Sequence, residues 1–221
     1  MEKIVKISQT ISYWTAQFLL RFLLHYQIEG QENLRELEEK AIIFASNHAS
    51  YVDSLLGAVS LPRTRGCFYP AKFFPIRFLA SGHFLAHPIK NIFIIFYIWI
   101  HGSIWVKKGR GDLQTALKEV VLALKKGEKV WIFPEGKRSR DGKLGQGKRG
   151  VAYLHKETGA PIVPVAFIGT FRILSPKAFL KAFFGFKKIK VVFGKPICSL
   201  DEGSLEQGVD KVMSAIKELM I

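Results

Sequence analysis

Short apolar runs alternate along the chain with longer stretches of helical spacing, and this alternation predicts an α/β protein. In the clearest helix, Asp112 precedes a stripe of leucine, alanine and valine that stops at Gly127. Strands that alternate with helices favour a domain built around a largely parallel sheet flanked by helices. The runs typical of strands lie at 41–46, 103–106, 129–133, 162–168 and 189–193. Other helical patterns lie at 3–27, 50–59, 83–100, 148–157 and 204–220, and 61–77 is expected to be irregular.

The N-terminal helical pattern carries aromatic and aliphatic residues on most faces, which is typical of a helix in lipid or in a core. Its apolar stretch 11–24 is interrupted by Gln17 and Arg21, and it is shorter than the roughly 20 residues that a spanning helix needs. We expect residues 1–28 to form an amphipathic helix in the membrane interface, and 29–221 to form a single α/β domain. A helix buried in the core is the alternative.

The composition narrows the class of partner. The chain has 221 residues and a formal net charge of +15, while 48% of its residues are hydrophobic and 18 are Phe. A strongly basic chain seeks an anionic partner, and so much apolar surface points to a lipid surface before nucleic acid. The two cysteines, Cys67 and Cys198, show neither metal-ligand spacing nor a disulfide framework.

Polar residues follow the predicted strand 41–46 and include His48 and Asp53. Ligands in parallel sheets sit beyond the carboxyl ends of the strands, so this exit is a candidate site. With His48 on a loop and Asp53 in the first helical turn, the carboxylate accepts a hydrogen bond from one imidazole nitrogen and raises the basicity of the other. Such a pair takes a proton from a hydroxyl. In the alternative interpretation His48 bonds the helix start and Asp53 favours the helix dipole.

A second polar segment follows the strand 129–133 and reads Pro134, Glu135, Gly136, Lys137, Arg138, Ser139. A glycine turn dense in Lys and Arg suits phosphate, because Arg binds its oxygens in pairs and Gly allows close backbone approach. Glu135 is expected to orient Arg138 or to bind a glycerol hydroxyl. A solvated basic loop, or one that touches anionic lipid heads, is the alternative.

Together these segments resemble the glycerolipid acyltransferase family, which contains the 1-acylglycerol-3-phosphate and lysophospholipid acyltransferases. Asn47-His48 with Asp53 matches the NHx4D motif, and Phe133 to Ser139 resembles FPEGTRS with Lys137 in place of Thr. The segment 102–108 is similar to the GxIFxxR motif, with Trp105 and Lys108 as departures. The segments 147–152 and 163–165 also resemble family motifs. Four motifs in order are strong evidence.

The resemblance implies a glycerol-3-phosphate acyltransferase-like fold and a set of roles. His48 is the expected general base and Asp53 its partner. The expected acceptor-binding residues are Lys108, Glu135, Gly136, Lys137, Arg138 and Ser139. The family implies acyl-ACP or acyl-CoA as the donor, with no metal and no further cofactor.

The same resemblance implies 1-acyl-sn-glycerol-3-phosphate as the acceptor and phosphatidic acid as the product. The enzyme is expected to be monotopic on the cytoplasmic face of the cell membrane, against its anionic lipids. Apolar residues of 73–100 are candidates for an acyl channel or for plain core. The segment 178–190 mixes Phe with Lys and is a candidate second membrane contact or a plain surface turn.

Three rival functions stay open at this point. The acceptor could be another lysolipid, or the chain could be a non-catalytic lipid-binding protein of the same fold. A basic nucleic-acid-binding protein is disfavoured, because residues 134–150 contain no aromatic side chain to interleave with the bases.

Overall fold

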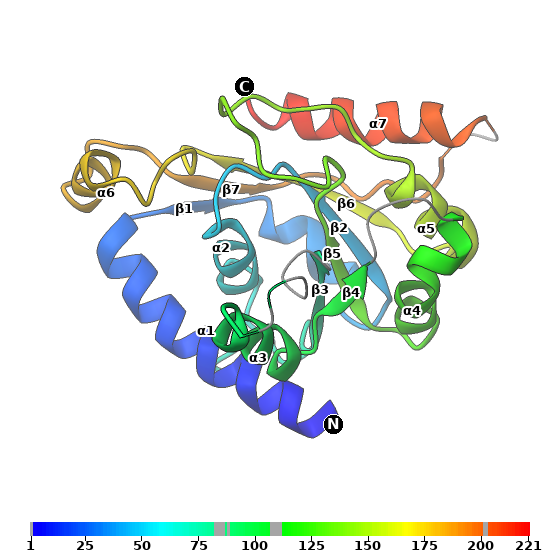
Figure 1. The fold of residues 1–221 in the computed structure, drawn as a ribbon, viewed down its shortest axis with the longest axis horizontal. Helices are drawn as coiled ribbons and strands as arrows, with labels where there is room; N and C mark the ends of the chain where they lie inside the picture. Colours follow the sequence, from blue (N-terminus) through cyan, green and yellow to red (C-terminus); the bar gives the residue numbers. More distant parts are fainter. Residues whose placement is uncertain (1, 82–86, 88, 107–111, 201–202) are drawn as a thin grey trace.

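A mostly parallel sheet forms the centre of the protein (Figure 1). The computed structural model describes the chain except residues 1, 82–86, 88, 107–111 and 201–202. Within this described part, seven strands pair in the order β1-β7-β6-β2-β5-β3-β4, and every pair but β6–β7 runs parallel. This confirms the α/β class that the sequence predicts. The strands are β1 (Gln27–Glu29), β2 (Ile42–Ser46), β3 (Ile76–Ser81), β4 (Ile104–Val106), β5 (Lys129–Ile132), β6 (Ile162–Ile168) and β7 (Lys190–Phe193).

Helices cover both faces of this sheet (Figure 1). Helices α4, α5 and α7 pack on one face, while α1 and α2 lie on the other. The helices are α1 (Glu2–Leu24), α2 (Asp53–Val59), α3 (Ile92–Ile100), α4 (Leu113–Lys125), α5 (Gly150–Thr158), α6 (Pro176–Phe183) and α7 (Leu205–Glu218), with a 3-10 helix η1 (Gln31–Leu37).

The strand β2 shows why its sequence is an unbroken apolar run. Ile42 and Phe44 point into the core on the α1 side, while Ile43 and Ala45 point into the core on the α4 side. Successive side chains of a strand face opposite ways, so a strand covered on both faces is apolar at every position. All five residues of β2 are buried, which places its carboxyl end in the middle of the fold.

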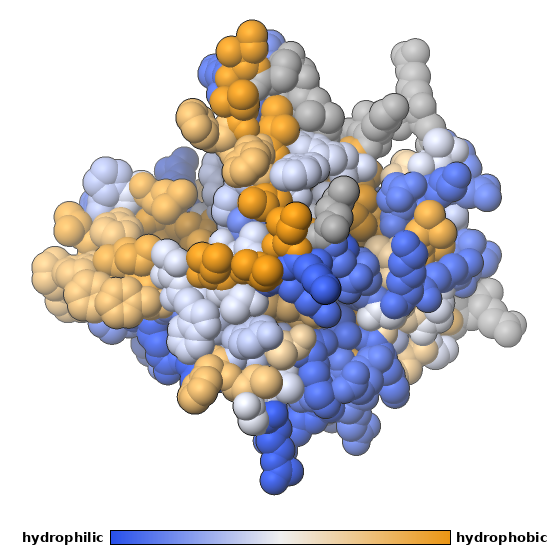
Figure 2. Space-filling model, turned by 90° about the horizontal axis from the view of Figure 1, so that it is seen from below, coloured by the Kyte–Doolittle hydropathy of each residue, from blue (hydrophilic) through white to orange (hydrophobic). Residues whose placement is uncertain are grey.

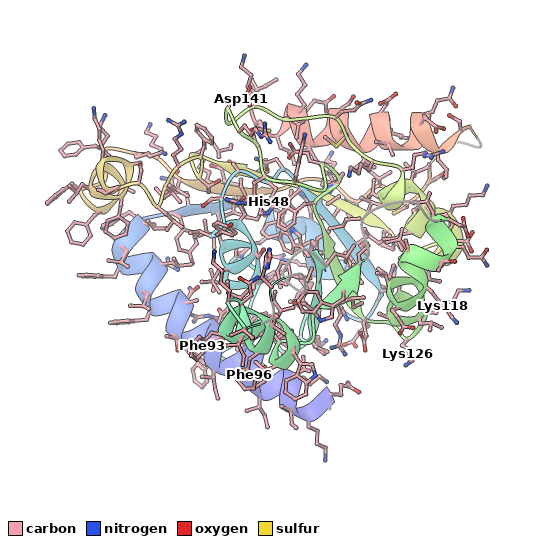
Figure 3. The ribbon with its side chains drawn as sticks, viewed as in Figure 1. His48, Phe93, Phe96, Lys118, Lys126 and Asp141 are labelled. Atoms are coloured by element: carbon pink, nitrogen blue, oxygen red, sulfur yellow. The ribbon has the colours of Figure 1, made fainter. Side chains whose placement is uncertain are left out.

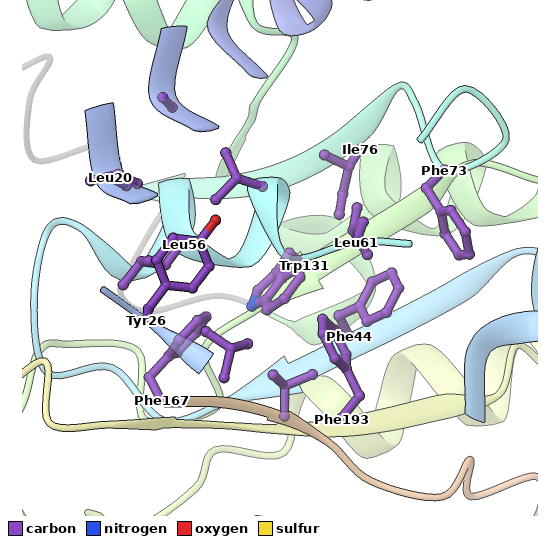
Figure 4. Close-up of a cluster of buried hydrophobic side chains, with 14 of the residues drawn as sticks. Leu20, Tyr26, Phe44, Leu56, Leu61, Phe73, Ile76, Trp131, Phe167 and Phe193 are labelled. Atoms are coloured by element: carbon purple, nitrogen blue, oxygen red, sulfur yellow. The ribbon is translucent and has the colours of Figure 1, made fainter. Parts of the chain in front are cut away.

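Trp131 of β5 is the centre of the core on the α1 side (Figure 4). Its ring stacks on Phe44 at 4.9 Å between centroids and on Phe167 at 5.8 Å. Its indole N–H donates to the hydroxyl of Ser46 at 2.8 Å, so the buried donor is satisfied. Gly57 of α2 lies so close that a Cβ there would sit 2.7 Å from the indole. The glycine therefore lets α2 approach the sheet directly behind the exit of β2.

Helix α1 has a buried side and an exposed side. Gln9 is buried on its inner side, where Nε2 donates to the carbonyl groups of Ile76 and His101, each at 2.8 Å, and Oε1 accepts from the Ile76 amide. The inner side also carries Val5, Tyr13, Ala16, Leu20 and Leu24. The outer side exposes Ile4, Ile7, Ile11, Trp14, Phe18 and Phe22. One side of the helix therefore belongs to the core, and the other exposes a row of large apolar side chains.

His101 joins the end of α3 to α1. Its Nδ1–H donates to the carbonyl of Tyr97, and its Nε2 accepts from the Ser12 hydroxyl at 2.7 Å. Burial lowers the pKa of the His101 imidazole, and the Tyr97 hydrogen bond opposes this shift. Burial therefore favours the neutral ring.

Strand β1 and the 3-10 helix η1 were not expected, and three other elements also differ from the sequence expectation. Strand β3 begins at Ile76, inside the proline-containing stretch 61–77, which the sequence predicted to be irregular. The helix expected over 83–100 is a helix only over α3 among its described residues. Helix α6 lies in the segment expected as a membrane contact or a turn, and Pro176 begins it because Pro tolerates the first helical turn. Among the described residues, no helix is long and apolar enough to cross a bilayer.

Candidate active site

The exit of β2 is held in place by Asn47, which is buried. Its side-chain NH₂ donates to the carbonyl of Phe167 at 2.9 Å, and its oxygen accepts from the amide of the same residue at 2.7 Å. This two-way bridge fastens the end of β2 to the end of β6. His48 therefore leaves the sheet at a defined point. Asn47 is the first residue of the NHx4D motif in the sequence, but the sequence does not indicate that Phe167 is its partner.

His48 and Asp53 meet, as expected for a loop histidine and an aspartate that begins a helix. His48 Nδ1 lies 3.0 Å from Asp53 Oδ2, and Asp53 is the first residue of α2. The same oxygen accepts from the amides of Ala49 and Ser50, each at 2.7 Å. The Asp53 side chain is fully buried, so three hydrogen bonds on one oxygen fix it. It in turn fixes the imidazole with Nδ1–H as the donor.

The ring of His48 is also held from the side. It stacks on Phe133, which follows β5, with 3.9 Å between centroids and 17° between the planes. The side chain keeps 17% of its surface exposed. Among the described residues, Nε2 has no hydrogen-bond partner. The imidazole is therefore immobile yet accessible, with a free lone pair on Nε2.

Glu135 connects the two candidate motifs directly. Its side chain is buried, and its Oε1 accepts from the amide of His48 while Oε2 accepts from the amide of Gly145, each at 2.9 Å. The Ser139 amide donates to the carbonyl of His48 at 2.7 Å. Both main-chain groups of His48 are thus bonded to the loop that follows β5. Gly145 suits the contact, because a Cβ there would lie 2.8 Å from Oε2.

The glycine turn after β5 makes room for Lys148. Gly136 has a φ of +66°, and a Cβ there would lie 3.1 Å from both Cε and Nζ of Lys148. The Lys148 amide also donates to the carbonyl of Pro134 at 2.9 Å. The Lys148 ammonium group is therefore held above the turn. The sequence indicates Lys148 only as part of a basic run.

Arg138 lies against Tyr51 in the turn that follows His48. Its Nη2 donates to the Tyr51 hydroxyl at 2.8 Å, and its guanidinium carbon lies 3.6 Å from the ring centroid. Stacking leaves other donors of the guanidinium open to an anion. Residues 136–150 contain a single acidic residue, Asp141. The exposed cations of the same stretch are Lys137, Arg138, Arg140, Lys143, Lys148 and Arg149.

Ser139 and Asp141 shape the far part of this loop. The Ser139 hydroxyl donates to Asp141 Oδ1 at 3.0 Å and accepts from the Gly142 amide at 2.9 Å. The amide of Lys143 also donates to Asp141, and this bond with that from Ser139 lowers the pKa of the Asp141 carboxyl. The Ser139 side chain thus supports the turn, while Lys137 and Arg138 before it are exposed.

Two further expectations concern Lys108 and metal ions. Lys108, an expected acceptor-binding residue, lies outside the described residues. Within the described ones, no group of three His, Cys, Asp or Glu side chains is arranged to hold a metal ion.

The fold is similar to a solved structure. The crystal structure of the 1-acyl-sn-glycerophosphate (LPA) acyltransferase PlsC from Thermotoga maritima superposes with a TM-score of 0.63 at 21% identity, over 99% of this chain and 77% of that protein. At this identity the likeness concerns the fold.

Relatives are also found by sequence. The 1-acyl-sn-glycerol-3-phosphate acyltransferase LPAT1 of Arabidopsis thaliana chloroplasts is 30% identical over 77% of this chain and 43% of its own length. The chloroplastic BAT2 protein of the same description from Brassica napus is 28% identical, over 77% and 44%. The chain thus spans less than half the length of these relatives. The Acyltransferase family profile matches residues 25–168, which is most of the chain and includes both candidate motifs. The chain therefore belongs to the Acyltransferase family.

Proposed function

We propose that the protein is an O-acyltransferase that transfers a fatty acyl group from a thioester donor to the free hydroxyl of 1-acyl-sn-glycerol-3-phosphate, giving phosphatidic acid. One observation carries the proposal. A histidine with Nδ1 bonded to a buried carboxylate and Nε2 free stands at a strand end, and its main chain is bonded to a cationic loop. A general base thereby lies beside groups suited to a phosphate. The relatives from Arabidopsis thaliana and Brassica napus are named as acyltransferases of this acceptor, which supports the same choice.

In this mechanism His48 is the general base. Its Nε2 takes the proton from the acceptor hydroxyl, and Asp53 stabilises the resulting imidazolium through the 3.0 Å contact to Nδ1. The alkoxide oxygen attacks the thioester carbonyl carbon, so that a C–O bond forms and the C–S bond then breaks. The imidazolium returns the proton to the departing thiolate. The products are an ester and a free thiol, and the histidine is neutral again.

Lys137 and Arg138 bind the acceptor phosphate in this proposal, with Gly136 allowing close approach. Arg138 is supported by its stacking on Tyr51, which pre-orients the guanidinium and lowers the entropy lost on binding. Lys148, held over Gly136, adds a further cation to the same side. Glu135 and Ser139 act through the loop that they hold together. Lys108 remains part of the proposed cradle by resemblance alone.

The acceptor is a membrane lipid, so the enzyme must reach a bilayer. We place the outer side of α1 on the membrane surface, because it exposes large apolar side chains along its length, and α3 beside it exposes Phe93, Phe96 and Trp99. Figure 3 shows Phe93 and Phe96 on the same lower side of the molecule as α1. An amphipathic helix of this kind lies in the interface without spanning it. The proposed location is the cytoplasmic face of the cell membrane, with an acyl-ACP or acyl-CoA donor.

The decisive experiment is an acyl-transfer assay with a panel of lysolipid acceptors against both thioester donors, read by mass spectrometry. We expect the highest rate with 1-acyl-sn-glycerol-3-phosphate. Replacing His48 with Ala should lower kcat by about 10²- to 10⁴-fold, which is the usual contribution of a general base. Binding of the variant to vesicles and its circular dichroism should match the wild type.

A matched control is His25→Asn. His25 is an exposed histidine with a φ of +45°, a conformation that Asn tolerates. This variant should keep full activity. Near-normal turnover by the His48→Ala protein would end the general-base assignment, and inactivity of the wild type with every acceptor and donor would end the proposal itself.

A further inference from the structure

Helix α6 forms an amphipathic projection at the edge of the molecule (Figure 1). Ala182 is buried, and Phe183 packs edge-to-face on Phe22 of α1 with 5.9 Å between centroids. The outward side and the turn after it expose Leu180 (54%), Phe184 (64%) and Phe186 (82%). The inner side thus anchors the helix to α1, and the outer side presents three large apolar groups to the surroundings.

The sequence around these apolar groups is rich in cations and contains no acidic residue. No Asp or Glu occurs between Glu157 and Asp201, whereas this stretch holds seven Lys and Arg residues. Lys181 and Lys188 are exposed, and neither has an ion-pair partner among the described residues. Lys187 donates to the carbonyl of Phe171, and burial together with the charge of Lys181 lowers its pKa. Lys190 of the same stretch pairs with Glu29 at 2.6 Å. The positive charge that faces the surroundings near α6 is therefore that of Lys181 and Lys188.

The apolar groups of α6 continue those of α1. Figure 2 shows the hydrophobic surface as it is seen from below, spread over the α6 side and the middle of the molecule rather than over the side that holds α4. The ring contact between Phe22 and Phe183 joins the two helices. Single exposed apolar residues are normal, but three close together that extend a larger patch mark an interaction site.

We propose that the surface formed by Leu180, Lys181, Phe184, Phe186 and Lys188, here the α6 surface, is a second membrane contact that selects anionic bilayers. The apolar side chains enter the acyl region, while the ammonium groups stay at the level of the lipid phosphates. Charge complementarity identifies the partner, since an apolar patch edged by exposed lysines fits an anionic bilayer. This inference deepens the proposed function, because it states which bilayers the enzyme occupies when it meets its lipid acceptor.

The charge part is tested with vesicles of phosphatidylcholine alone and with 30% phosphatidylglycerol added, at about 0.1 M salt. Each lysine near an anionic surface contributes enough for about a fivefold change in affinity, so Lys181→Gln with Lys188→Gln should weaken binding about 10- to 30-fold on the anionic vesicles. Binding to phosphatidylcholine vesicles should hardly change.

The matched control is Lys118→Gln with Lys126→Gln on α4. These two lysines are exposed, and replacing them removes the same net charge as the α6 double variant. Figure 3 places them at the opposite side of the molecule from α6. We expect them to leave vesicle binding within about twofold of the wild type. Equal losses in both double variants would show that net charge and not the α6 surface governs binding, and would overturn the inference.

The apolar part is tested by comparing Leu180→Ser with Leu122→Ser. Leu122 of α4 is 42% exposed and thus a fair counterpart to Leu180. Leu180→Ser should weaken binding to anionic vesicles about tenfold, because the leucine side chain is transferred from water to the bilayer on binding. Leu122→Ser should not weaken binding. Full vesicle binding by the Leu180→Ser protein would contradict a membrane role. So would a result in which Leu180→Ser weakens binding of the protein to duplex DNA and leaves its binding to vesicles unchanged.

An activity assay with detergent-dispersed acceptor separates this inference from the proposed function. The α6 variants should turn over such an acceptor at the wild-type rate, because no bilayer has to be bound. His48→Ala should be inactive in detergent and on vesicles alike. Failure of the α6 variants in detergent would place α6 in the catalytic structure and overturn its assignment as a membrane contact.

Discussion

Glu135 offers a sharp test of how the two motifs act together, because its carboxylate is the buried link between them. In the variant Glu135→Gln, the amide has one oxygen for the two main-chain N–H groups of His48 and Gly145 that the carboxylate accepts. One N–H then faces the amide NH₂. A hydrogen bond to a charged group contributes about 1.5–3 kcal/mol, and an unpaired buried donor costs about 1–3 kcal/mol more.

Even at the lower end, this loss amounts to about 2 kcal/mol or more of the free energy of unfolding. For a chain of this size each kcal/mol moves Tm by about 2–4 °C, so we expect a fall of at least about 4 °C. Displacing the main chain of His48 should also lower kcat about 10- to 100-fold, because small misplacements of a reacting group are costly. The KM for the acceptor should change little.

The measurement combines thermal unfolding with steady-state kinetics on the purified variant. Glu119→Gln on α4 is the control, since Glu119 is exposed and the change in charge is the same. A contact of Glu135 with the acceptor glycerol, as the sequence suggests, would instead raise KM and leave Tm unchanged. That result would refute the view that this carboxylate holds the site together.

Two further predictions follow from the structure. Replacing Arg138 with Ala should raise the acceptor KM about 10- to 100-fold, because a charge-assisted contact to phosphate is lost, and an unchanged KM would place the phosphate elsewhere. Burial lowers the pKa of His101 in the folded protein, so the unfolded chain takes up the proton first as the pH falls below about 6.5. The Tm of the wild type should therefore fall more between pH 7.5 and 5.5 than that of His101→Gln, and equal falls would contradict this linkage.

Local patterns account for much of what the sequence predicts correctly. Strands β2, β5 and β6 are mostly apolar because they are covered on both faces, so their residues alone identify them. Helix α4 is likewise identified by its stripe and by the glycine after it. The pairing of His48 with Asp53 is also predictable from local sequence, since they are five positions apart and a helix start fixes their geometry.

The sequence does not predict elements whose own residues show no clear periodicity. Strand β3 follows three prolines, and its pairing with β5 and β4 rather than its own pattern makes it a strand. Helix α6 has a short apolar-basic sequence that suits a turn equally well, and its packing on Phe22 decides the outcome. Propensity is a weak guide for such short segments, because tertiary contacts override it.

The order of residues along the chain is enough to predict the α/β class, the order of the motifs and the kinds of side chain in the site. The contacts of those side chains follow from the tertiary fold. Glu135 binds the main chain of His48 across 87 residues, and Asn47 binds Phe167 across 120. Arg138 rests on Tyr51, again 87 residues away. Contacts between distant residues depend on how strands are ordered in the sheet, and no local periodicity carries that information.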